Sequence, residues 1–130
     1  MSMGVQHGTK NTTRVGQRAE RLAEQWLESK GLKLIERNAR TRFFELDLIM
    51  QDAQEIVFVE VKYRKNARYG GGVGAMSADK QRRLSVGALC WLTEQGLWEK
   101  PVRFDVVEVL GEGSNLQVIH YPDCFVVETN

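Results

Sequence analysis

The sequence predicts an α/β fold in which a mixed β-sheet is flanked by helices, with elements in the order α-β-β-β-α-β-β. Two apolar stripes at helical spacing predict the helices. Apolar runs rich in β-branched residues predict strands that are buried on both faces. The chain has 130 residues and shows no internal repeat or domain linker, which suits one domain. We therefore expect a single domain over residues 14–130, preceded by a flexible N-terminal tail over residues 1–13.

The first helix is predicted from an apolar stripe formed by Val15, Ala19, Leu22, Ala23 and Trp26. Thr12 or Thr13 can cap its start, and Gly31 can end it. A first strand is predicted over residues 32–36, followed by a basic connection over residues 38–42.

The two central strands are predicted over residues 45–50 and 56–62, with a short polar connection that suits a hairpin loop. The glycine-rich residues 70–74 are expected to form a mobile flap; they are not a P-loop, because no Gly-Lys-Ser/Thr follows. Ser77 can cap the second helix and Gly96 can end it. The remaining strands are expected at residues 102–110 and 116–119, with a short edge strand at 125–127.

Each central strand carries an acidic residue inside its apolar run, Asp47 in the first and Glu60 in the second. An unpaired charge is costly to bury, so such a carboxylate usually has a partner, often a metal ion. If Met50 or Gln51 pairs with Ile56, Asp47 lies opposite or beside Glu60, at a Cβ separation of about 4.5–5.5 Å when directly opposed. A slip of one residue would turn Asp47 to the other face of the sheet.

Lys62 follows Glu60 by two residues, so both side chains point to one face of the strand. Two carboxylates and a lysine are the parts of a metal-dependent phosphodiesterase site. Mg²⁺ is usually held by one or two carboxylates together with waters and substrate phosphate oxygens. We therefore assign Asp47 and Glu60 as metal ligands. Lys62 is expected to act on the attacking water or to stabilise the charge of the transition state.

Two further acids are candidates for this site. On a helical wheel Glu20 lies about 20° from Leu27, at the edge of the buried stripe, from where it can lean over the sheet toward the metal. The alternative is a plain surface glutamate. Glu45 shares a strand face with Asp47, and it is either a further ligand, a partner of a ligand or a charge at the strand end.

Basic residues are concentrated in the part of the chain that holds these acids. Residues 14–83 contain 15 Lys and Arg against 10 Asp and Glu, whereas residues 84–130 contain 2 against 7. This asymmetry indicates a polyanionic partner at one face, with ordinary solvated charge as the alternative. The residues expected to bind nucleic acid are Arg37, Arg40, Arg42, Arg64, Lys80 and Arg83.

Other kinds of site have little support. His7 and His120 are far apart in the sequence, so neither a zinc site nor a histidine-based triad is indicated. Cys90 and Cys124 lack CxxC spacing and are expected to be buried free thiols, which favours a reducing compartment. No apolar run approaches the roughly 20 residues that span a bilayer, and the N-terminus has no signal-peptide pattern. We therefore expect a cytoplasmic protein that does not associate with membranes.

Five short motifs together resemble the YraN-like family of bacterial proteins. They are Gly16-x-x-x-Glu20-x-x-Ala23-x-x-x-Leu27, Arg37-Asn38-x-Arg40, Glu45-Leu46-Asp47-Leu48-Ile49, Val59-Glu60-Val61-Lys62-x-Arg64 and Lys80-Gln81-Arg82-Arg83-Leu84. That family is similar to the archaeal Holliday-junction resolvases and belongs to the wider PD-(D/E)XK nuclease superfamily. The resemblance implies a restriction-endonuclease-like core over residues 14–130, Mg²⁺ or Mn²⁺ as the cofactor and a metal-site role for Glu20. The chain departs from the family at Phe44, where glycine is usual.

The expected function is therefore a metal-dependent DNA endonuclease that hydrolyses phosphodiester bonds. By analogy with the resolvases we also expect selectivity for branched DNA and action as a homodimer. Two alternatives stay open: a nucleic-acid-binding module with weak or no catalysis, and a protein-interaction scaffold that uses the acidic C-terminal part. The presence of Asp47, Glu60 and Lys62 together favours the enzyme, because a pure binder needs lysines and arginines but no buried acids.

Overall fold

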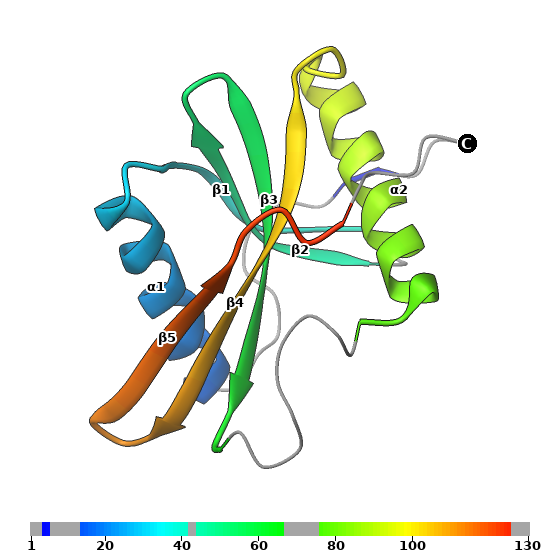
Figure 1. The fold of residues 1–130 in the computed structure, drawn as a ribbon. Coiled ribbons are helices and arrows are strands. Elements are labelled where there is room, and N and C mark those ends of the chain that lie inside the picture. Colours follow the sequence, from blue (N-terminus) through cyan, green and yellow to red (C-terminus); the bar gives the residue numbers. More distant parts are fainter. Residues whose placement is uncertain (1–3, 6–13, 42–43, 67–75, 126–130) are drawn as a thin grey trace.

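The fold of the chain is described from a computed structural model, which describes residues 4–5, 14–41, 44–66 and 76–125. The elements follow the predicted order α-β-β-β-α-β-β (Figure 1). They are α1 (Arg14–Ser29), β1 (Lys33–Arg40), β2 (Glu45–Asp52), β3 (Glu55–Arg64), α2 (Ala78–Gln95), β4 (Val102–Glu112) and β5 (Asn115–Tyr121). The five strands form one sheet in the order β1-β2-β3-β4-β5.

The sheet is mixed, as predicted. The pairs β1–β2, β2–β3 and β4–β5 are antiparallel, whereas β3 and β4 are parallel and are connected through α2. A parallel pair needs such a crossover, because a tight turn cannot return the chain in the same direction. The β2–β3 hairpin closes through Ala53 and Gln54, with Ala53 at a positive φ of 55°. Its register pairs Gln51 with Ile56, which is one of the two predicted registers.

The two helices cover opposite faces of the sheet (Figure 1). On one face, α1 packs its buried Ala19, Ala23 and Leu27 against apolar residues of β2, β3 and β4. On the other face, α2 contributes Leu84, Ala88, Trp91 and Leu92 to a core with the aromatic rings of β3 and β4. A strand in such a three-layer arrangement is buried on both sides, which explains the continuous apolar runs.

The helix ends agree with the sequence where the structure describes them. Ser77 caps α2, with its Oγ accepting the N–H of Lys80 at 3.1 Å, and Gly96 ends the helix in the left-handed conformation. Gly31, at φ 98°, follows the end of α1, and the Leu32 N–H returns to the Leu27 carbonyl. This is the pattern of a glycine-terminated helix. The predicted caps Thr12 and Thr13 lie outside the described residues.

Three expectations need correction. The first strand runs from Lys33 to Arg40, so most of the predicted basic connection is strand, because β2 offers it backbone partners along this length. Val15 is 50% exposed rather than part of the buried stripe. Of the edge strand expected at residues 125–127, residues 126–127 lie outside the described residues, and Phe125 is not in a strand; its ring stacks on Phe104, with centroids 4.4 Å apart. No helix in the described part of the chain is long and apolar enough to cross a membrane.

Candidate active site

Strands β2 and β3 separate from each other partway along their length. Their backbone pairing runs from the hairpin only as far as Leu48 opposite Val59. Beyond this pair β2 stays with β1 up to Glu45, whereas β3 continues beside β4 up to Arg64 (Figure 1). We call this point of divergence, just beyond the pair Leu48–Val59, the fork. Here backbone groups on the facing sides of both strands lose their ladder partners, so other polar groups must hydrogen-bond to them.

Asp47 fills this need at the fork. Its side chain is buried, and Oδ2 accepts the N–H of Val61 at 2.8 Å. Leu46 and Leu48 belong to the cores on opposite faces, although regular alternation would place them on one face. The strand therefore twists at Asp47. Across on β1, Asn38 adopts a positive φ of 56°, which asparagine tolerates better than most residues.

Glu60 reaches the fork from β3. Ile56 and Phe58 of the same strand pack in the core beneath α2, so alternation directs Glu60 to this face as well. Its side chain is only 16% exposed. Oε1 lies 2.5 Å from the Lys80 ammonium, whereas Oε2 is buried and has no hydrogen-bond partner in the described part of the chain. A buried carboxylate oxygen without a partner is costly, so this atom is suited to receive a ligand.

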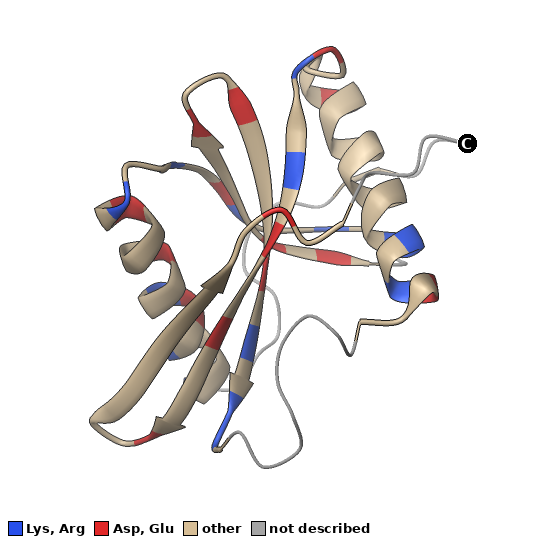
Figure 2. Ribbon diagram, viewed as in Figure 1, with Lys and Arg blue, Asp and Glu red and all other residues tan. Residues whose placement is uncertain are grey.

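Asp47 and Glu60 line one open pocket of about 410 Å³. Its other lining residues are Phe44, Glu45, Val61, Lys80, Arg83 and Leu84. A much smaller cavity of about 10 Å³ also borders both carboxylates, room for about one water molecule. Figure 2 shows basic residues at the N-terminal end of α2 and toward the C-terminal end of β3. Asp47, Glu60 and Lys62 were expected to converge at one point; Asp47 and Glu60 line the same pocket, whereas Lys62 is not among its lining residues.

The residues at the fork fit a divalent cation held by few protein ligands. No three His, Cys, Asp or Glu side chains gather at metal-binding distance among the residues that the structure describes. Mg²⁺ does not require such a cluster, since one or two carboxylates with waters and substrate oxygens are its usual set. Asp47 and Glu60 would supply the carboxylates, and Oε2 of Glu60 is a buried carboxylate oxygen without a hydrogen-bond partner in the described residues. Glu45 lies at the rim of the same pocket and is exposed.

Lys62 lies two residues beyond Glu60 on β3 and is half-buried. It forms no ion pair with any residue in the described ranges. Its register partner on the neighbouring strand β4 is Glu108. The Glu108 side chain is almost completely buried and pairs with Arg64 at 3.3 Å. Lys62 therefore lies between two acidic positions on one sheet face, but it is not among the residues that line the pocket.

Other predicted site residues are placed differently. Glu20 is half-buried on α1, which covers the opposite face of the sheet, and it does not line the pocket. Arg37 is bound to Glu24 of α1 by two hydrogen bonds, of 2.6 and 2.8 Å. These bonds and the charge of Glu24 raise the pKa of Arg37 above its ordinary value.

Two more of the predicted arginines, Arg40 and Arg64, are not among the residues that line the pocket. Arg40 ends β1 opposite Glu45 and is half-buried, and Arg64 is engaged with Glu108. Arg42 and the predicted glycine-rich flap lie outside the described residues. Of the six residues expected to bind nucleic acid, Lys80 and Arg83 are the two that line the pocket with the carboxylates.

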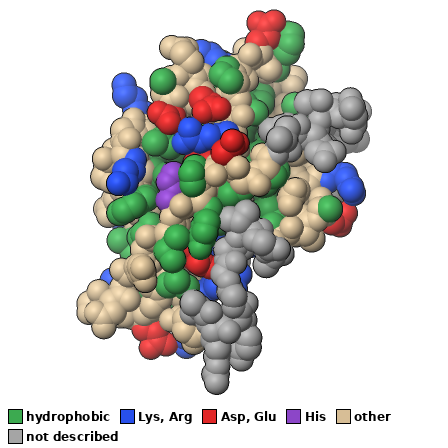
Figure 3. All heavy atoms as spheres, viewed as in Figure 1, with side chains coloured by type: hydrophobic (Ala, Val, Ile, Leu, Met, Phe, Trp, Pro, Cys, Tyr) green, Lys and Arg blue, Asp and Glu red, His purple; other side chains and the backbone are tan. Residues whose placement is uncertain are grey.

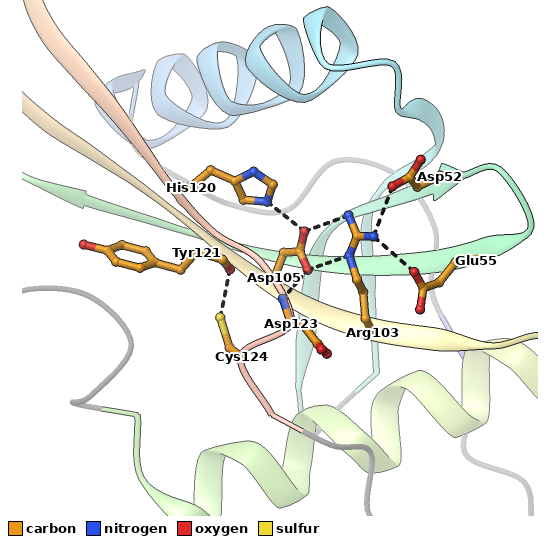
Figure 4. A network of polar contacts seen from close by, with 8 residues as sticks. All are labelled: Asp52, Glu55, Arg103, Asp105, His120, Tyr121, Asp123 and Cys124. Carbon is orange, nitrogen blue, oxygen red and sulfur yellow. Dashed lines mark hydrogen bonds and ion pairs between the residues drawn. The ribbon is translucent and has the colours of Figure 1, made fainter.

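A second polar cluster lies around Arg103 of β4 and is shown in Figure 4. Asp105, whose side chain is fully buried, accepts hydrogen bonds from Arg103 and from the Asp123 backbone, and its Oδ2 lies 2.7 Å from His120 Nε2. Arg103 also reaches Asp52 and Glu55 of the β2–β3 hairpin, at 3.1 Å each. Figure 3 shows acidic, basic and histidine side chains gathered on this face.

This cluster explains the charge state of Arg103. Burial alone would lower its pKa, but the hydrogen bonds and charges of Asp105, Asp52 and Glu55 outweigh burial and raise the pKa above its ordinary value. Every oxygen of Asp105 has a partner, so the cluster joins β4, β5, the C-terminal segment and the hairpin. We interpret it as a structural network.

Sequence reasoning missed two acids buried in β4, Asp105 and Glu108, and the contact between Lys80 and Glu60. The acids carry the same signal that identified Glu60, a carboxylate inside an apolar strand. Applying that criterion to residues 102–110 would have found both. No sequence pattern predicts the contact of Lys80 with Glu60, because it depends on the position and orientation of α2 relative to β3.

Comparison with known proteins places the chain among bacterial relatives of similar length. The model of the uncharacterised protein family UPF0102 matches residues 19–109. A UPF0102 protein of Pseudomonas entomophila is 46% identical over 99 residues, which are 75% of this chain and 80% of the relative. One from Nitrosococcus oceani is 39% identical over 115 residues, covering 88% and 93%, and one from Colwellia psychrerythraea is 42% identical over 120 residues, covering 89% and 93%.

Among solved structures, SfsA of Pyrococcus furiosus in complex with Ca²⁺ is similar with a TM-score of 0.39 and 17% sequence identity. The match covers 82% of this chain and 62% of that one. A similarity at this level carries no argument about the site or its chemistry.

Proposed function

Because the chain belongs to UPF0102, a family without an assigned activity, we propose its function from the fork itself: a metal-dependent DNA endonuclease of the PD-(D/E)XK type. The observation that supports this proposal best is that Asp47 and Glu60 line one pocket and that Oε2 of Glu60 has no hydrogen-bond partner in the described residues. Lys80 pairs with Oε1 of Glu60, but a buried carboxylate oxygen without a partner is still costly, and a bound divalent cation would remove that cost.

Asp47 and Glu60 would hold Mg²⁺ or Mn²⁺, and Asp47 is fixed for this role by its hydrogen bond from Val61. When bound, the cation would lower the pKa of a water molecule and neutralise phosphate charge. The chain's own cations have separate tasks. Lys62 would orient the attacking water and stabilise charge in the transition state. Arg83, at the pocket wall, would position the phosphate.

The substrate class follows from the basic residues beside the pocket. Lys80 and Arg83 on α2 line a pocket whose acids would be occupied by metal, and Lys62 follows the pocket residues Glu60 and Val61 on β3. Contacts from lysine and arginine to phosphate supply affinity without reading sequence. We therefore propose DNA as the substrate, while selectivity for branched DNA and action as a homodimer stay predictions.

A second candidate is a nucleic-acid-binding module with little or no turnover. It is favoured by one observation, that fewer than three metal-ligating side chains gather at the fork in the described ranges. The two functions are separated by a cleavage assay on linear, nicked, flapped and four-way DNA with Mg²⁺ or Mn²⁺. The enzyme is expected to cut at least one of these substrates, and cleavage should disappear in the Glu60→Gln variant. Binding without cleavage under every metal condition would leave the binding module.

A further inference from the structure

The ion pair between Lys80 and Glu60 lies directly on the proposed metal ligand. Lys80 Nζ is 2.5 Å from Oε1 of Glu60, and the lysine side chain is 40% exposed against 16% for the glutamate. The two residues come from different layers, Lys80 from α2 and Glu60 from the sheet. The ammonium therefore provides the positive charge that a buried carboxylate requires, on the same carboxylate that would hold the metal.

The location of Lys80 in its helix suggests that this contact is specific. It is the third residue of α2, and its backbone N–H is already bound by the capping Ser77. A positive side chain in the first turn opposes the helix dipole, which favours acidic residues there. Asp79, beside it, follows that preference and pairs with Arg82 on the surface. Lys80 is thus unfavourably placed for its own helix, but its contact with Glu60 compensates.

We propose that Lys80 is a resident counter-cation, which neutralises Glu60 in the metal-free protein and must leave when a divalent cation binds. The inference rests on the proposed function of the fork. A cation at Glu60 and the ammonium at 2.5 Å from the same carboxylate would repel each other strongly in this partly buried site. Once displaced, Lys80 remains at the pocket wall beside Arg83 and can contact a phosphate. Metal binding would thereby prepare the site for a polyanion.

The test is calorimetric titration of Mn²⁺ into the metal-free full-length protein, for the wild type and for Lys80→Met. Methionine keeps the aliphatic length of lysine and removes the charge. If the ammonium competes for Glu60, the variant should bind Mn²⁺ about tenfold or more tightly than the wild type. Its thermal midpoint in EDTA should fall, because the carboxylate loses its partner, and Mn²⁺ should restore the midpoint.

Two matched variants separate occupancy from general charge. Arg83→Met removes a cation from the same pocket that has no bond to Glu60, and Arg82→Met removes one that pairs with Asp79 outside it. Both should change Mn²⁺ affinity by less than about threefold, as screened charges do. A double variant, Glu60→Gln with Lys80→Met, should show no tightening, because the ligand for which they compete is gone.

The outcomes distinguish this inference from the proposed function. If the wild type binds Mn²⁺ and Lys80→Met binds no more tightly than Arg83→Met, Lys80 is not the competing cation and the inference is overturned. If only Lys80→Met binds, the counter-cation role is supported, whereas the proposal that the native protein is metal-dependent fails. If no variant binds Mn²⁺, both proposals fail, since removing the ammonium has not opened the site.

Discussion

The ring of Phe44 lies directly against Gly87 of α2, in the space that a β-carbon on that glycine would occupy. A β-carbon built at Gly87 would come within 2.1 Å of the Phe44 ring. Phe44 is buried in the core beneath α2 and also lines the pocket. The aromatic residue at this position therefore packs between the helix and the fork, and glycine at 87 makes room for it.

Gly87→Ala should consequently destabilise the protein, although alanine is the better helix former. The added methyl group must push a buried ring aside, which typically costs about 1–3 kcal/mol. The gain in helix propensity recovers at most about 1 kcal/mol. Chemical denaturation of both proteins measures the difference. Thr93→Ala, at an exposed site of the same helix, is the control and should be close to neutral.

Replacing Phe44 as well identifies the cause. In the Phe44→Leu background the smaller side chain leaves room for the methyl group, so Gly87→Ala should cost less than it does in the wild type. Equal costs in the two backgrounds would mean that the ring does not limit residue 87. Such a double-mutant cycle isolates the contact between two touching side chains.

Asp47 has two roles, and two substitutions separate them. Asp47→Asn keeps an oxygen to accept the Val61 N–H, so the variant should fold normally while its Mn²⁺ affinity falls. Asp47→Ala removes the acceptor too and should lose a further amount of about 1–3 kcal/mol. Calorimetry and denaturation of both variants give the two quantities. Equal stability of the two variants would show that the Val61 hydrogen bond contributes nothing.

That Asp47 and Glu60 line one pocket could be expected from the sequence, because both lie in apolar strands joined by a short hairpin; Lys62 was expected to converge with them but does not line that pocket. The apolar pattern determines the face of each residue, and the hairpin length limits the register. The twist at Asp47 was not predictable, since it depends on β1 and on the positive φ of Asn38. The length of β1 was underestimated because its second half, which ends at Arg40, lacks the alternation of apolar and polar residues that predicts a strand.

Helix-to-sheet relationships were harder to predict for a physical reason. A helical wheel shows which residues of α1 face the sheet, but it does not show which of the two sheet faces the helix covers. The prediction for Glu20 needed that information, and α1 lies on the face opposite to α2. For the same reason the contact between Lys80 of α2 and Glu60 of β3 could not be predicted, because it joins residues of two layers. Glu20 as a metal ligand stays a prediction.

Lys62→Ala should separate binding from catalysis. Lys62 has no ion-pair partner among the described residues and is not among the residues that line the pocket, so its loss would remove one of several cations that we propose to contact phosphate. DNA affinity measured in Ca²⁺ should therefore change by less than about threefold, whereas cleavage in Mg²⁺ should fall by about a hundredfold or more. Lys65→Ala, at the exposed end of the same segment, is the control. Full cleavage by Lys62→Ala would remove this residue from the catalytic set.

The network around Asp105 should be a major source of stability. Asp105→Asn keeps the shape of the side chain but removes the closest of the three acidic partners of the partly buried Arg103, and the lost charge-assisted hydrogen bonds typically cost about 1.5–3 kcal/mol. Asp123→Asn is the matched control, because Asp123 contributes its backbone N–H to the network. That control should lie within about 0.5 kcal/mol of the wild type. A small effect of Asp105→Asn on the denaturation midpoint would show that the network is not a structural centre.

Some arginines of the basic part of the chain, residues 14–83, should contact DNA, whereas others should stabilise the fold. Arg83 lines the pocket, so Arg83→Gln should weaken binding to all duplexes alike and make the log–log salt slope shallower by about 0.9. Arg37 is bound to Glu24 between β1 and α1, so Arg37→Gln should leave the slope unchanged and cost about 0.5–1 kcal/mol of stability. The measurement is a salt titration of binding to one fixed duplex in Ca²⁺. If Arg37→Gln changes the slope and Arg83→Gln does not, DNA lies on the α1 side of the sheet rather than across the fork.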